Sequence, residues 1–182
     1  MKRIILNLAF IMMIVSVTNA QTDKEDWLVG GNMTINTTSN NSQFTLQPSA
    51  GYFFAKNFAA GSELTLSFGK FGDTKTSIIG AGPFARYYFD LRNSDFKPLI
   101  HADFTFANEV TKYQGLKTSN TVTSFFIGAG GAYFINSNVA LEAVAGFNRS
   151  KVENESPEGG FLFRIGFQVH LLGHEVSRLK RD

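Results

Sequence analysis

Large apolar side chains occupy every second position from Phe161 to Leu171, and mostly polar or small residues occupy the positions between them. Successive side chains of a β-strand point to opposite faces, so a period of two predicts a strand with one wholly apolar face. Strands of globular proteins are usually about 5–6 residues long, whereas a tilted transmembrane strand needs about 9–11. The run therefore predicts the last strand of a small membrane barrel.

Similar alternating runs fill the rest of the chain from Trp27 onward, and segments rich in turn residues separate them. The predicted strands are residues 27–36, 44–54, 58–68, 76–89, 99–106, 124–135, 139–148 and 161–171. An even number of such runs is typical of up-and-down antiparallel barrels. The pattern therefore predicts an all-β fold, an eight-stranded antiparallel up-and-down transmembrane β-barrel.

The connections between these runs predict the orientation of the barrel. Those after the first, third, fifth and seventh runs are mostly longer and more polar, and residues 108–120 form the longest. Bacterial barrels keep short turns in the periplasm and longer loops outside. We therefore expect both termini in the periplasm and extracellular loops at 36–42, 69–75, 108–120 and 150–160.

Charged side chains within the runs fall on the face opposite the large apolar residues. A lysine or arginine facing lipid at the bilayer midplane costs about 2–4 kcal/mol, so these charges are expected to face the lumen and to pair across it. Large side chains accompany them, and an eight-stranded barrel is only just wide enough for side chains to fill. We expect a plugged lumen with a charge network of Glu63, Arg86, His101, Asp103, Glu142, Arg164 and His170.

The two ends of the chain lie outside the predicted barrel. Residues 1–20 begin with Lys2 and Arg3, continue as a short apolar run and end in Ala20, which predicts a cleaved secretory signal peptide. Residues 21–172 are then the barrel, and the polar residues 173–182 a periplasmic tail. No later segment has the 18 consecutive apolar residues of a transmembrane helix.

Composition excludes several classes of function. Residues 21–182 keep 15 of the 17 Lys and Arg residues against 15 Asp and Glu, so no basic surplus points to nucleic acid as a partner. The chain has no cysteine, which excludes disulfides and thiolate metal sites. Neither the histidine spacing nor the glycine-rich segments predict a metal or cofactor site, so we expect none.

These features resemble the small outer-membrane β-barrel proteins of Bacteroidetes-type bacteria, often grouped under "outer membrane protein beta-barrel domain" or the porin family. The resemblance lies in the signal peptide, the eight runs and GAGPFARYYF from Gly80 to Phe89, followed by a short polar turn. Its plan is similar to OmpX- and OmpA-type barrels. It implies the outer membrane of a Gram-negative bacterium, contact with outer-membrane lipid, and insertion by the barrel assembly machinery. The terminal aromatic of many such barrels is missing, so the assembly signal is expected to be internal.

Three functions remain open on the sequence. The leading hypothesis is a structural or surface-interaction role, including adhesion to an extracellular ligand or host surface through the loops. A narrow channel for ions or small solutes, lined by the lumen charges, is the alternative. A lipid-modifying enzyme using His101 and Asp103 is the third, but no His-x-Ser pair accompanies them, and we expect no enzymatic activity.

Overall fold

The computed structural model describes residues 22–172 apart from 39–40, 92–93 and 154. The predicted signal peptide and the tail at 173–182 lie outside the described residues. The described part of the chain forms β1 (Trp27–Thr38), β2 (Asn41–Ala55), β3 (Phe58–Phe71), β4 (Thr74–Tyr88), β5 (Phe96–Tyr113), β6 (Leu116–Phe134), β7 (Val139–Val152) and β8 (Glu158–Leu171). It includes no helix long and apolar enough to cross a membrane.

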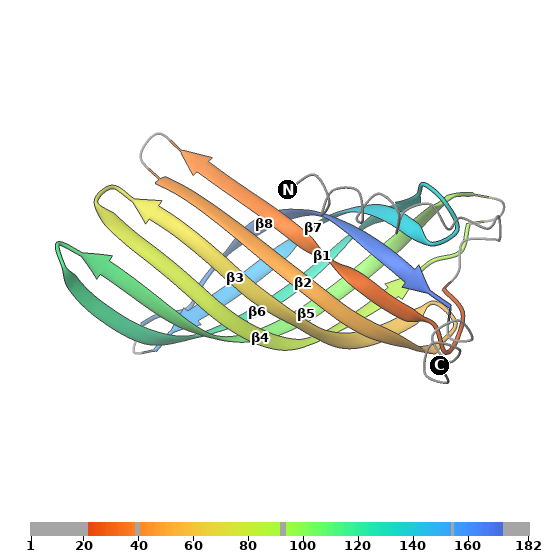
Figure 1. The fold of residues 1–182 in the computed structure, drawn as a ribbon, viewed down its shortest axis with the longest axis horizontal. Helices are drawn as coiled ribbons and strands as arrows, with labels where there is room; N and C mark the ends of the chain where they lie inside the picture. The colour runs from red at the N-terminus through yellow and green to blue at the C-terminus, as the bar shows by residue number, and fades with distance from the viewer. Residues whose placement is uncertain (1–21, 39–40, 92–93, 154, 173–182) are drawn as a thin grey trace, which may run out of the picture.

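Each strand pairs antiparallel with the next, and β8 pairs with β1, so the sheet closes on itself (Figure 1). Trp27 lies opposite Tyr52 on one side and Leu171 on the other, which joins the two ends of the sheet. Closure pairs residues 27–33 of β1 with 165–171 of β8, so along these residues neither strand has a free edge and the backbone hydrogen bonds are satisfied within the barrel. The predicted eight-stranded antiparallel barrel is confirmed.

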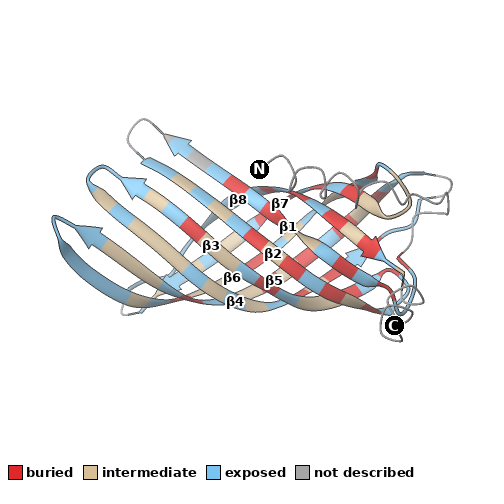
Figure 2. Ribbon diagram, in the orientation of Figure 1, coloured by how far each residue is buried: buried red, intermediate tan, exposed pale blue. Residues whose placement is uncertain are grey.

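Alternate residues of the strands are buried and exposed, as Figure 2 shows along β2, β5 and β8. In β8, Phe161, Phe163, Ile165 and Phe167 lie on the outside, whereas Arg164, Gly166, Gln168 and His170 face the lumen and are buried. The predicted assignment of faces therefore agrees with the structure: apolar side chains face outward, and polar side chains fill the inside.

Two prolines interrupt the backbone pairing without breaking the barrel. Pairing of β2 with β3 skips Pro48 and its neighbour Gln47, and pairing of β4 with β5 skips Pro83 and Gly82. Proline has no backbone N–H and cannot donate to a ladder. The other neighbouring strand still pairs at each position, since Pro48 lies opposite Gly31 and Pro83 opposite Ser62.

The predicted lengths of the connections are wrong. Residues 108–120 belong mainly to β5 and β6, which pair from Phe96–Tyr133 to Tyr113–Leu116 and leave only Gln114 and Gly115 as the turn. Both turn residues have positive φ, 47° and 84°, as a type I′ hairpin turn requires. Polar threonines and lysines pair here as readily as apolar residues do, because backbone hydrogen bonds need no apolar side chains.

The remaining connections follow the same trend. Residues 72–73 separate β3 from β4 and 153–157 separate β7 from β8, whereas the connections at the opposite end are 56–57, 89–95 and 135–138, so neither end has consistently longer connections. The polar segments thus form protruding hairpins rather than loops (Figure 1). Loop length therefore no longer supports the predicted orientation of the barrel in the membrane.

Candidate functional site: the charged lumen

A buried cluster of charged and aromatic side chains fills the barrel. Arg86 on β4 reaches across the lumen to Glu142 on β7, where its Nη1 donates to Oε2 over 2.6 Å. Tyr88, two residues along β4 on the same face, donates to the other carboxylate oxygen at 2.8 Å. The side chains of Arg86 and Glu142 are 1% and 0% exposed, so the pair lies in a medium where it is poorly screened.

His101 on β5 connects this pair to a second one. The Nε of Arg86 donates to Nδ1 of His101 at 3.2 Å. Because a guanidinium N–H can only donate, Nδ1 accepts, and the ring proton lies on Nε2. That nitrogen lies 3.0 Å from Oδ2 of Asp103 and donates to it. The geometry thus fixes one neutral tautomer of His101.

Asp103 also accepts from Arg164 on β8. The Nη1 of Arg164 donates to Oδ2 at 2.5 Å and its Nη2 to Oδ1 at 3.5 Å. The network therefore runs continuously from Glu142 through Arg86, His101 and Asp103 to Arg164, linking β4, β5, β7 and β8.

Glu63 on β3 lies at the edge of this network. Its Oε1 is 4.0 Å from Nη1 of Arg164 and accepts from Nε2 of Gln47 at 2.9 Å. No hydrogen bond to its Oε2 is found within the described structure, although that atom is buried. With Asp103 and Glu142 it makes three carboxylates against the guanidinium groups of Arg86 and Arg164. This cluster thus holds one carboxylate more than it holds guanidinium groups.

Aromatic rings pack the space around the charges. The guanidinium of Arg164 lies 3.8 Å from the ring centre of Phe126, a close cation–π contact, and Phe84 stacks on His101 at 5.7 Å. Gly128 and Gly146 make room for Phe126, since a Cβ on either would lie 2.7 Å from a ring carbon. These two glycines of the lumen thus accommodate the ring.

His170 is the one expected member that the structure places elsewhere. Its ring lies among Phe53, Tyr88 and Phe134, with ring centres 5.6, 5.7 and 5.1 Å away. It belongs to a mainly apolar layer near the start of β1 and the end of β8, which also contains Leu28 and Leu99. Of the residues expected in the network, Glu63, Arg86, His101, Asp103, Glu142 and Arg164 are brought together.

The chemistry open to this cluster is limited by what each group already binds. Donor atoms of Glu63, His101 and Asp103 lie within 4.8 Å of one another, close enough to surround a metal ion. However, Arg164 is bound to Asp103 and near Glu63, so a metal would have to displace a cation. For acid–base chemistry on lipid, His101 and Asp103 would need access to the outer face, yet they are only 2% and 3% exposed. The geometry therefore favours a structural ion network.

A second polar cluster closes the end of the barrel where β1 begins and β8 ends. Lys97 donates to Asp90 and to Thr22, both at 2.8 Å, and Asn57 donates to Asp90 at 2.8 Å. Thr22 also donates to the side-chain oxygen of Asn57. These hydrogen bonds from Lys97 and Asn57 lower the pKa of Asp90 from 3.8 to about 2. The cluster ties the segment before β1 to two turns.

Sequence reasoning missed this cluster and the role of Gln47. The position of Gln47 could have been found, because it alternates with the outward Leu46 and Pro48 and therefore points into the lumen beside Glu63. Thr22, Asn57, Asp90 and Lys97 carry no such signal. They come from separate turns and strand ends, where the period of two does not apply.

Comparisons with known proteins agree with this architecture. A sequence profile of the family described as "Outer membrane protein beta-barrel domain" matches residues 7–170. No curated protein matches the sequence.

Solved structures show the same fold. Neisserial surface protein A superposes with a TM-score of 0.63 at 22% identity, covering 80% of this chain and 97% of that one. The N-terminal β-barrel domain of Pseudomonas aeruginosa OprF gives 0.54 at 16%, covering 81% and 98%. OprG from Pseudomonas aeruginosa gives 0.51 at 10%, covering 85% and 99%. The Bacteroidetes-type assignment stays a prediction.

Proposed function

Because the chain belongs to the family of outer membrane proteins with a β-barrel domain, we propose that it is a non-conducting barrel that presents hairpins at the cell surface for structural or adhesive contacts. The observation that carries this proposal is the filled lumen. Buried side chains from β3, β4, β5, β6, β7 and β8 meet across it, and Arg86, Phe126 and Arg164 are at most 4% exposed.

The protruding hairpins support the surface role. At the tip of the β5–β6 hairpin, Tyr113 and Leu116 lie opposite each other, 48% and 75% exposed, beside Gln114 and Gly115. Exposed aromatic and aliphatic side chains on a rigid tip are suited to anchoring in a pocket of a partner. One matched structure is named a surface protein, which is consistent with this role.

We propose that these hairpins face outward and that both termini are periplasmic. The support is the length of polar strand that continues past the outward-facing Phe106 and Phe125. Since the chain has no cysteine, Gly115→Cys and Lys56→Cys each create one label site, at opposite ends. On intact cells a membrane-impermeant maleimide should label the Gly115→Cys variant and leave the Lys56→Cys variant unlabelled. The reverse pattern would show that the barrel has the opposite orientation in the membrane.

Adhesion is tested by shortening the β5–β6 hairpin in register. Deleting 110–113 and 116–119 joins Glu109 to Gln114 and Gly115 to Asn120, and Glu109 and Asn120 already face each other. The turn and the direction of every remaining side chain are kept. Binding of cells that display this variant to host-cell and matrix surfaces should fall, with Tyr113→Ser/Leu116→Ser giving the same loss. Unchanged binding by both would argue against adhesion through this tip.

The charged lumen favours one other function, a narrow channel. Glu63, whose Oε1 is 4.0 Å from Arg164 and whose Oε2 is buried, supplies the third carboxylate of the cluster, a charge that would attract a cation. Conductance through the intact barrel separates this alternative from the proposed role.

A further inference from the structure

A row of lysines crosses the outer surface of four neighbouring strands. Lys70 on β3 lies opposite Lys75 on β4, Lys75 lies opposite Lys112 on β5, and Lys112 lies opposite Lys117 on β6. All four are exposed and alternate with inward residues, so they point away from the lumen. Adjacent strands are about 4.8 Å apart, so the four backbone positions span about 14 Å.

The row begins where the apolar outer face ends. On β3 the outward residues run Leu64, Leu66 and Phe68 before Lys70, and on β2 they run Leu46 and Phe44 before Ser42. An aromatic ring followed directly by a cation is the pattern of the membrane–water interface, where rings lie at headgroup level and lysines reach into it.

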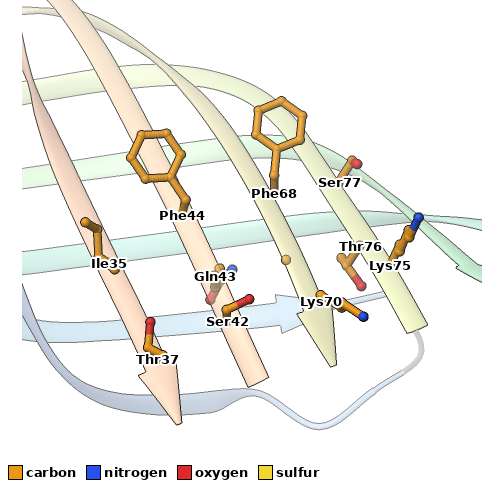
Figure 3. Close-up of a pocket in the computed structure, with 11 residues that line it drawn as sticks. Ile35, Thr37, Ser42, Gln43, Phe44, Phe68, Lys70, Lys75, Thr76 and Ser77 are labelled. Carbon is orange, nitrogen blue, oxygen red and sulfur yellow. The ribbon is translucent and has the colours of Figure 1, made fainter. Parts of the chain in front are cut away.

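A groove joins these two kinds of side chain. It has a volume of about 430 Å³ and is lined by Ile35, Phe44 and Phe68 together with Lys70, Lys75 and polar residues. Figure 3 shows the rings of Phe44 and Phe68 projecting side by side, with Lys70 and Lys75 nearer the ends of β3 and β4. The groove is thus apolar toward the membrane and cationic beyond it.

Four like charges in register are unfavourable unless an anion lies among them. Like charges directly opposite each other destabilise a strand pair. Within the described chain, no Lys70, Lys75, Lys112 or Lys117 ammonium group has a carboxylate within 4.0 Å. The protein itself therefore leaves their charge uncompensated, although Asp and Glu are as numerous as Lys and Arg outside residues 1–20.

We propose that this groove is a binding site for the phosphorylated glycolipid of the outer leaflet. An acyl chain packs along Phe44 and Phe68, and a sugar phosphate lies between Lys70 and Lys75. Because the strands of such barrels tilt by about 35–45°, the row rises from the membrane toward Lys112 and Lys117, which contact anionic groups farther out on the same glycolipid. The assignment rests on the proposed orientation, in which this end faces outward.

Lipid rather than a soluble anion is indicated by the apolar half of the site. A free phosphate would use the lysines and leave the rings of Phe44 and Phe68 without a role. Polybasic clusters at a membrane surface recognise anionic headgroups, with a contribution of about 1 kcal/mol per lysine. That contribution corresponds to about a fivefold gain in affinity for each lysine.

Titration of the purified, folded barrel in maltoside detergent tests the proposal, with native mass spectrometry counting bound lipid. The probes are diphosphorylated lipid A, its dephosphorylated form, phosphatidylglycerol and heparin. Lys70→Gln/Lys75→Gln should bind lipid A about 25-fold more weakly than the unmodified protein. Lys112→Gln/Lys117→Gln should lose less of its affinity for lipid A. The control Lys24→Gln/Lys56→Gln removes the same charge from the opposite end and should bind normally.

Heat-shifted gel mobility first confirms that each variant is folded. Equal binding of the dephosphorylated lipid, or an equal loss in the control, would overturn the phosphate site. Phosphatidylglycerol binding as tightly as lipid A would overturn the glycolipid assignment, and heparin binding more tightly would assign the row to a sulfated surface partner instead. Labelling of the Gly115→Cys variant on cells tests the orientation separately. A wrong orientation can therefore be told apart from a wrong lipid-binding site.

Discussion

The lumen around Arg86 and the tip of the β5–β6 hairpin are built from the same antiparallel ladder but are stabilised differently. In the lumen, side chains from strands far apart in sequence meet, as Arg86 and Glu142 do. Beyond Phe106 and Phe125 the β5–β6 pair continues with few buried side chains, as the ends of these strands in Figure 2 show. Backbone pairing alone is enough for a hairpin anchored in a barrel, and this leaves its side chains available for contacts.

The largest expected effect comes from breaking the ion pair inside the lumen. Glu142→Ala leaves Arg86 buried without its carboxylate, and removing one partner of a buried pair costs about 3–5 kcal/mol. Urea unfolding of the barrel in lipid vesicles measures this loss. Glu155→Ala, at an exposed position in the β7–β8 connection, is the control and should change stability by less than about 0.5 kcal/mol. Equal effects would mean that the lumen network contributes little.

A ring removed from the lumen should have the next largest effect. Phe126→Ala removes the ring under Arg164 and opens a cavity, at a cost of about 3 kcal/mol. The neighbouring Phe125 points outward and is 43% exposed. Phe125→Ala is therefore a matched control that should lose less stability than Phe126→Ala, because lipid fills the vacated space. A greater loss for Phe125→Ala would contradict the assignment of the two faces.

A smaller, pH-dependent effect is expected at the closed end of the barrel. The pKa of Asp90 is lowered from 3.8 to about 2, so its contribution to stability is complete above pH 4–5 and is lost as the pH falls toward 2. Asp90→Asn should therefore be less stable than the unmodified protein at neutral pH, and the difference should shrink between pH 4 and pH 2. Asp90 is partly exposed, which keeps this difference modest. A difference in stability that stays constant between pH 4 and pH 2 would show that ionisation of the Asp90 carboxylate is not its cause.

The smallest effect on stability is expected from the hairpin. Deleting 110–113 and 116–119 removes paired residues that bury few side chains, so the free energy of unfolding should change by about 0.5 kcal/mol or less. The same urea titration measures it beside Glu142→Ala. A loss as large as that of Glu142→Ala would show that the hairpin is part of the stabilising core and not a surface appendage.

The sequence predicts the barrel and the facing of its residues well, because a period of two fixes both once one face must meet lipid. Glu63, Arg86, Asp103 and Arg164 could be placed in the lumen from alternation alone. Their partners could not, since pairing across the lumen depends on strand tilt and stagger, which a single sequence does not reveal. His170 illustrates this point: its inward direction was predictable, but its aromatic surroundings were not.

The hairpin tips were misread for a different reason. Polar segments such as 108–120 look like loops when apolar alternation is the only strand signal. In the structure, threonines face each other across the ladder, as Thr111 and Thr118 do, and the strands continue to the turn. Their ends are set by the Gln114–Gly115 turn and not by loss of hydrophobicity.

Conductance of the purified, refolded barrel in planar lipid bilayers tests the central claim, the filled lumen, most directly. We expect no unitary current from the unmodified protein, whereas Phe126→Ala/Arg164→Ala, which removes a ring and the cation stacked on it, should admit a leak. Steady unitary steps from the unmodified barrel that change with Glu63→Gln would contradict the account and establish a channel.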